Sequence, residues 1–245
     1  GGAVYAQSSI WGGQNPTNVK ISNSVFDANR AGGSNFGAGG AIYIEDKYNG
    51  SLKMNTIISD SVFTNNVATE GGAIYVDSSD ITLKVGADKN LSYVGNVATD
   101  GDSAGGFMYI VKPNAEKYPN GKGSATFDVD GSLTIGNGKV GFDSIASGSN
   151  GGTTITKLGS GILTVNSSME YFKDSLIVSA GEMLVNNVLG ASSISIANGA
   201  SLGLTVGGAN VLSNSSLTFE NNGIFVLKAR ADLAAGEYDI SAAGL

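Results

Sequence analysis

The most constraining feature of the sequence is a glycine-rich unit that occurs four times in its first half. The unit reads Gly-Gly-Ala-Val-Tyr from Gly1, and closely similar units begin at Gly39, Gly71 and Gly105. Successive units begin 38, 32 and 34 residues apart. Self-similarity at a period of about 20 to 50 residues is typical of proteins in which one supersecondary unit stacks on the next. We therefore expect a repeat protein.

A second unit, an aromatic residue followed three positions later by asparagine, precedes three of the glycine units. Its copies are Phe26 with Asn29, Phe63 with Asn66, and Tyr93 with Asn96. In a parallel stack, equivalent positions lie above one another, so that identical side chains form ladders. A buried asparagine ladder can satisfy its own amides by hydrogen bonding from level to level. The pattern predicts such ladders here.

Short runs in which apolar and polar residues alternate fill most of the chain, for example at 81–85 and 202–206. Such runs, bounded by Gly, Asn, Asp and Ser, predict strands and an all-β fold. Among β-sandwiches, propellers and solenoids, the solenoid is favoured because the repeat is longer than a hairpin and shorter than a propeller blade. With strands of about 5 residues and roughly 20–25 residues in a coil, we expect a parallel β-solenoid of about ten coils.

The composition excludes several kinds of chemistry. The 245 residues include neither cysteine nor histidine, so disulfides, cysteine nucleophiles and Ser-His triads cannot form. The net charge of −7, without basic blocks, argues against a nucleic-acid partner. No apolar run approaches the length of a membrane helix, and the first residues do not resemble a signal peptide. We expect a segment of a longer protein.

Acidic residues that lie close in the sequence are the remaining candidates for catalysis or calcium binding. Solvation of turns by these acids is the simpler interpretation, and we expect no catalytic residue, metal or cofactor. Asp46 and Asp77 each follow a Gly-Gly-Ala-Ile-Tyr unit and are expected on neighbouring coils. Calcium candidates are Asp100 with Asp102 and Asp128 with Asp130. The acid pairs are Glu45 with Asp46, Asp77 with Asp80, Asp100 with Asp102, and Asp128 with Asp130.

Two groups of residues are candidates for ligand binding. Segment 113–122 carries two of the three prolines and is expected to protrude as a loop, which is where solenoids often carry recognition. Matching tyrosines in the glycine units could form an aromatic ladder that packs internally or, if exposed, stacks on sugars. The candidate ligand-binding residues are Lys112, Lys117, Tyr118, Lys122, Tyr43, Tyr75 and Tyr109.

Over residues 1–112, the alternating Gly-Gly-Ala-Ile and Phe-x-x-Asn units resemble the repeats of polymorphic membrane proteins and related autotransporter passengers. Tyr93 replaces the phenylalanine in the third copy, and Phe107 replaces the alanine of the fourth glycine unit. Cysteine, which is common in the chlamydial members, is absent.

Residues 155–186 resemble the autotransporter-associated β-helix repeat. That repeat has Lys-x-Gly-x-Gly, alternating apolar residues, an aromatic residue, Val-x-x-Gly and a final strand. The matching positions are Lys157, Gly159, Gly161, Leu163, Val165, Tyr171, Val178, Gly181, Leu184 and Val185.

Together these resemblances imply a right-handed, single-stranded parallel β-helix. They place it on the surface of a Gram-negative cell, anchored at the outer membrane or secreted, with export through a C-terminal β-barrel translocator. The expected organisation is a repeat-bearing β-helix at 1–112, a protruding loop at 113–122, and a continuation of the β-helix at 123–245.

The expected function is non-enzymatic adhesion or self-association. The partner would be a host cell-surface protein or glycan, or another copy of the chain on a neighbouring cell. Two alternatives remain open, a β-helix polysaccharide lyase or hydrolase and an inert stalk that presents another domain. Two close carboxylates in a cleft would favour the enzyme.

Overall fold

The computed structural model describes residues 1–8, 18–32, 37–46, 54–112, 123–206, 216–220 and 222–229. These residues form strands and one short 3-10 helix, η1 (Asp102–Ala104), and every strand pair among them is parallel. None of the helical structure described here is long and apolar enough to cross a membrane. The expectation of an all-β chain with parallel strands is therefore confirmed.

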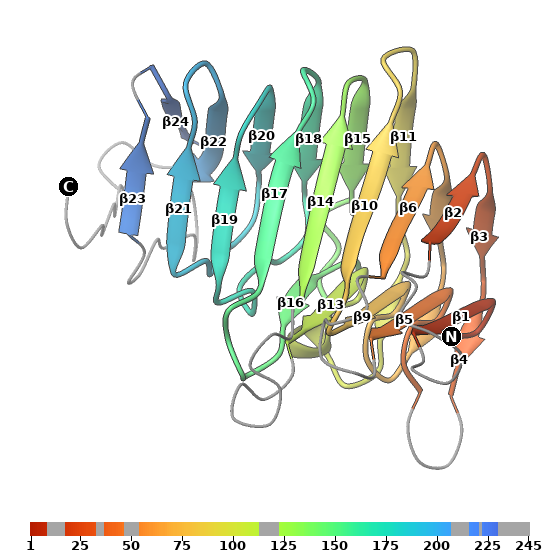
Figure 1. Ribbon diagram of the computed structural model, residues 1–245. Helices are drawn as coiled ribbons and strands as arrows, with labels where there is room; N and C mark the ends of the chain where they lie inside the picture. The colour runs from red at the N-terminus through yellow and green to blue at the C-terminus, as the bar shows by residue number, and fades with distance from the viewer. Residues whose placement is uncertain are drawn as a thin grey trace.

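Three stacks of strands make up most of the structure (Figure 1). The first sheet contains β1 (Val4–Ser8), β5 (Ile42–Asp46), β9 (Ile74–Asp77), β13 (Met108–Val111) and β16 (Ile145–Ser147). The second contains β2 (Asn18–Ser22), β6 (Asn55–Ser59), β10 (Asp80–Val85), β14 (Ser124–Val129), β17 (Thr154–Leu158), β19 (Ser175–Val178), β21 (Ser193–Ile196) and β23 (Ser216–Phe219).

The third sheet contains β11 (Asn90–Tyr93), β15 (Ser132–Ile135), β18 (Ile162–Val165), β20 (Glu182–Val185), β22 (Ser201–Val206) and β24 (Ile224–Ala229). Two small sheets lie at the amino-terminal end. They consist of β3 (Val25–Asp27) with β7 (Val62–Thr64), and of β4 (Arg30–Ala31), β8 (Val67–Ala68) and β12 (Val97–Ala98).

Each time the chain returns to a sheet it adds one strand beside the previous one; the third sheet begins at β11 and the first ends at β16, after which the chain alternates between the second and third sheets. Figure 1 shows the second sheet running from the red amino-terminal end to the blue carboxyl-terminal end, with the third sheet beside it from the yellow β11 onward. This arrangement is consistent with a β-helix. The second sheet has eight strands, so the described residues account for eight levels of the expected ten or so.

The aromatic ladder predicted from the repeats lies inside the stack. Phe26 and Phe63 are stacked with ring centroids 5.0 Å apart, and Tyr93 meets Phe63 edge-on at 5.4 Å. All three side chains are buried. Because they occupy equivalent positions on successive levels, their repetition in the sequence is explained by packing.

The asparagine ladder also forms. The Nδ2 of Asn29 donates to the Oδ1 of Asn66 at 2.9 Å, and the Nδ2 of Asn66 donates to the Oδ1 of Asn96 at 2.8 Å. Asp143 ends the row by accepting the Nδ2 of Asn96 at 2.8 Å and two backbone amides. A carboxylate suits this last position because it can accept all three of these hydrogen bonds. Burial raises the pKa of Asp143, and the hydrogen bonds from Asn96 and Gly95 oppose that rise.

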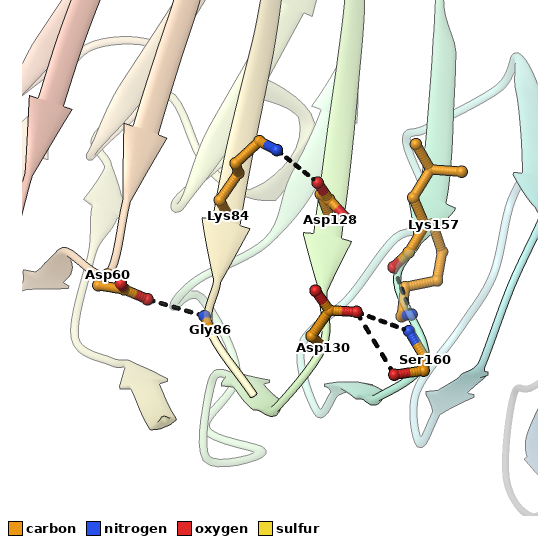
Figure 2. Close-up of polar contacts among 8 residues, drawn as sticks. Asp60, Lys84, Gly86, Asp128, Asp130, Lys157 and Ser160 are labelled. Carbon is orange, nitrogen blue, oxygen red and sulfur yellow. Dashed lines mark hydrogen bonds and ion pairs between the residues drawn. The ribbon is translucent and has the colours of Figure 1, made fainter. Parts of the chain in front are cut away.

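Lys157 occupies a core position of β17, in register with Phe127 and Val178. It is fully buried, and its Nζ donates to the carbonyl oxygens of Leu158 at 2.6 Å and Gly159 at 2.8 Å. The carbonyls of Val129 and Ala180 accept from it at 3.4 and 3.2 Å. Figure 2 shows this Nζ beside the turn that carries Ser160. The lysine therefore satisfies carbonyls at a corner of the stack.

We expect Lys157→Met to remove a specific pH dependence of stability. Burial lowers the pKa of Lys157 from 10.5 to about 8, so between these values the unfolded chain binds a proton that the folded chain has released. The contribution of Lys157 to the free energy of unfolding is therefore lowest below pH 8 and rises as the pH is raised. The unfolding free energy of the wild type, relative to Lys157→Met, should increase by roughly 1–2 kcal/mol from pH 8 to pH 10 in urea titrations. Lys20→Met is the control, because Lys20 is exposed on β2. If the difference in unfolding free energy between the wild type and Lys157→Met does not change with pH, the lowered pKa of Lys157 is wrong.

Candidate functional site

The outer face of the first sheet carries a row of four tyrosines. Tyrosine alternates with buried aliphatic residues in β5, β9 and β13 and with partly buried ones in β1, so its ring lies on the opposite face from these residues. The register pairs Tyr5 with Tyr43, Tyr43 with Tyr75, and Tyr75 with Tyr109. Their ring centroids lie 5.1, 5.0 and 5.6 Å apart in that order. The ladder predicted for Tyr43, Tyr75 and Tyr109 is confirmed, and Tyr5 extends it.

Exposure differs along this tyrosine row. Tyr5 is 52% exposed, Tyr75 is only 7% exposed, and Tyr43 and Tyr109 are half-buried. Tyr75 is therefore packing, and only the other three rings keep surface that a ligand could contact. Stacking of sugars along the whole row, considered from the sequence, is not compatible with a buried Tyr75.

Carboxylates lie beside several hydroxyl groups of the row. The Oη of Tyr5 donates to Glu45 at 2.7 Å, and the negative charge of this carboxylate also acts on Tyr43. Tyr75 hydrogen-bonds Glu70. Burial and the neighbouring carboxylate raise the pKa of Tyr5 to about 12, and burial raises the pKa of Tyr43, Tyr75 and Tyr109 as well. The hydroxyls therefore remain protonated donors at neutral pH.

Asp46 and Asp77, the acids after the glycine units, lie on neighbouring paired strands, as expected. Register places Glu45, rather than Asp46, opposite Asp77. Asp46 is buried and accepts from the Oγ of Ser8 at 2.5 Å. Burial raises the pKa of Asp77, and Glu45 and Asp46 add to this rise, while a 2.6 Å hydrogen bond from Ser78 opposes it.

A hollow of about 570 Å³ opens where the tyrosine row ends. On the level after Tyr109, the register position is occupied by Ala146, which has no ring to continue the row. Tyr171 lies one level further, where its carbonyl accepts the backbone amide of Ser147. The hollow thus lies between two tyrosines. Its lining includes Glu70, Asp100, Tyr109, Ser147, Tyr171 and Lys173.

The two carboxylates of this hollow come from a short repeat. Glu70 and Asp100 each end an Asn-Val-Ala-Thr sequence, and the backbone amide of Asp100 donates to the carbonyl of Thr69 on the level below. Burial raises the pKa of Glu70, and the nearby Asp100 raises it further, while the hydrogen bond from Tyr75 lowers it. Sequence reasoning did not select Glu70 as a site residue, although its repeat with Asp100 was a usable signal. Tyr171 and Lys173 were also missed as site residues because their place depends on the stacking of levels.

The other predicted binding residues lie apart from the hollow or outside the described residues. Lys112 follows β13, and its carbonyl accepts from the Nδ2 of Asn150 at 3.1 Å. It does not line the hollow. Lys117, Tyr118 and Lys122, with the whole of the expected loop 113–122, lie outside the described residues.

Both carboxylates of the calcium candidate Asp128 with Asp130 contact neighbouring residues of the chain (Figure 2). Asp128 forms an ion pair with Lys84 at 2.8 Å. Asp130 accepts from the backbone amide of Ser160 at 3.1 Å. In the part of the chain that the structure describes, no three potential ligands from His, Cys, Asp and Glu gather as a metal site would require.

Comparison with known proteins gives one informative match. The chain is 32% identical, over 209 residues, to the probable autotransporter YfaL of Escherichia coli (strain K12). The match covers 75% of this chain and 15% of that protein, so the chain spans a small part of the relative's length. No family model and no solved structure matches the chain. The similarity supports the resemblance to autotransporter passengers.

Proposed function

We propose that this chain is a surface-exposed passenger segment of a Gram-negative autotransporter that acts in non-enzymatic adhesion or self-association. The observation that carries the proposal is the outer face of the first sheet, with its tyrosine row and adjoining hollow. Its partner would be a host cell-surface protein or glycan, or a second copy of the chain on a neighbouring cell. A C-terminal β-barrel translocator would export the full-length protein.

The finer fold belongs to the same proposal. We infer that the stacked levels are successive coils of one right-handed, single-stranded parallel β-helix of about ten coils. The similarity to a probable autotransporter and the parallel, level-by-level growth of the sheets support this inference. A rigid stack of this kind can present many weak contacts whose summed strength depends on multivalency.

The contacts of the other candidate acids favour binding over catalysis. Glu45 accepts from the hydroxyl of Tyr5, Asp128 pairs with Lys84, and Asp130 accepts from Ser160. The pair Glu70 with Asp100 is the specific observation that favours the alternative, a glycan hydrolase, because such enzymes place two carboxylates in one cleft.

Display on cells tests the proposal. Cells that carry the full-length protein should sediment faster, or adhere better to host cells, than cells that carry the same protein without residues 1–245. Equal behaviour of the two strains would favour an inert stalk. The purified chain should release no reducing sugar ends from polysaccharides, and release that is lost in Glu70→Gln would establish the enzyme instead.

A further inference from the structure

The hollow beyond the tyrosine row has two aromatic walls. Tyr171 is 41% exposed, and Tyr109 on the other side is half-buried. The volume of about 570 Å³ lies within the range of small-molecule sites. Aromatic rings with one exposed face and a polar tip suit ligands that are apolar on one side and polar at their edge.

The residues that line the hollow between these two rings supply both hydrogen-bond acceptors and hydrogen-bond donors. Glu70 and Asp100 lie on adjacent levels, whose backbones are about 4.8 Å apart in parallel sheets. Lys173 is exposed and contributes an ammonium donor, and Ser147 contributes a hydroxyl. Neighbouring hydroxyl groups on one ligand could therefore donate to the two carboxylates while another accepts from Lys173.

The charge of the hollow selects against anionic ligands. Two carboxylates face one ammonium group, so a carboxylated or sulfated sugar would meet net repulsion. Glu70 is half-buried beside Tyr75, and its environment already disfavours further negative charge. A ligand with many hydroxyls and no charge fits these conditions.

We propose that this hollow binds a sugar ring of an uncharged glycan, with one face of the ring stacked on Tyr171 and its hydroxyls donated to Glu70 and Asp100. The proposal rests on the adhesive function proposed above and gives it a site and a ligand class. Tyr109 closes the opposite wall and connects the hollow to the tyrosine row.

Native affinity electrophoresis of the purified chain tests the proposal with named polymers. Dextran, galactan and mannan serve as uncharged probes, hyaluronan as an anionic probe and poly-L-lysine as a cationic one. We expect at least one uncharged polysaccharide to retard the chain. Retardation by none of the three, or by poly-L-lysine alone, would overturn the proposal.

Variants then assign the binding to the hollow. Tyr171→Ala should weaken retardation about tenfold, and Tyr171→Phe should leave it within about twofold, because stacking needs the ring and not the hydroxyl. Asp100→Asn should weaken it by several fold. Phe219→Ala is the matched control, because Phe219 is also 41% exposed but lies on β23 of the second sheet. Equal retardation of Tyr171→Ala and Phe219→Ala would contradict the proposed site.

The proposed adhesive function and the proposed sugar site can each be wrong without the other. If cells displaying the segment adhere but the chain binds no uncharged polysaccharide, the sugar site is wrong and adhesion stands. If the chain binds polysaccharide through Tyr171 but display changes neither sedimentation nor adherence, the sugar site stands and the adhesive function is wrong.

Discussion

Gly72→Ala is expected to destabilise the protein by about 4 kcal/mol or more, the range reached when buried backbone must move. Gly72 is the second glycine of its unit and is buried at a corner of the stack. A Cβ at this position would lie 2.2 Å from the carbonyl oxygen of Gly106 and 2.4 Å from that of Val97. Both are backbone atoms of the next level, so no side-chain rotation can relieve the overlap. Thermal unfolding followed by circular dichroism should show a fall in Tm of roughly 10 °C or more.

Gly32→Ala is the matched control for this prediction. Nothing lies within 4 Å of a Cβ at Gly32, and the residue is exposed. Its Tm should therefore change little. If Gly72→Ala melts at the same temperature as Gly32→Ala, the close approach of successive levels at the glycine corner is wrong.

Asn66→Leu is expected to cost about 4 kcal/mol, because it leaves several buried polar groups without partners. Asn66 is fully buried in the middle of the asparagine ladder. Its Oδ1 accepts from the backbone amide and the Nδ2 of Asn29, and its Nδ2 donates to the carbonyl of Phe26 at 3.0 Å and to Asn96. Leucine has nearly the same size but can replace none of these bonds. Urea unfolding at neutral pH measures the loss.

Asn186→Leu is the control for Asn66→Leu, because it removes a hydrogen-bonded amide from an exposed position instead of a buried one. The Nδ2 of Asn186 donates to the Oδ1 of Asn166 at 2.9 Å, and its Oδ1 accepts from Thr205 at 2.6 Å, but Asn186 is exposed and water can replace both bonds. We expect a change within about 0.5 kcal/mol. A comparable loss in both variants would show that the ladder contributes no more when buried than when exposed.

Much of the fold could be predicted from local patterns. Strands follow from period-two alternation, and the ladders of Phe26 and Asn29 with their copies follow from repetition at fixed places. The corner role of the glycines also follows from the repeat, because Gly39 adopts a φ of +64° that other residues avoid. These features depend on contacts between equivalent positions, which a repeat displays directly.

The hollow could not be predicted in the same way. Its walls come from Tyr109 and Tyr171, which are neighbours only because the level between them carries Ala146. The register of the acids was also open, and the structure pairs Glu45 with Asp77. A shift of one residue moves a side chain to the other face of a strand, and nothing local to either strand fixes that shift.

The sequence alone determined that this chain stacks parallel strands into levels, with rows of tyrosine, phenylalanine and asparagine, because each level repeats the side chains of the one before. Only the tertiary structure decided which of these rows is buried and where the tyrosine row is interrupted. Exposure and cavities depend on how each level lies on its neighbours, including the short helix η1 that packs against β16. The way each level lies on its neighbours depends on contacts between residues that are distant in the sequence, so no single repeat determines it.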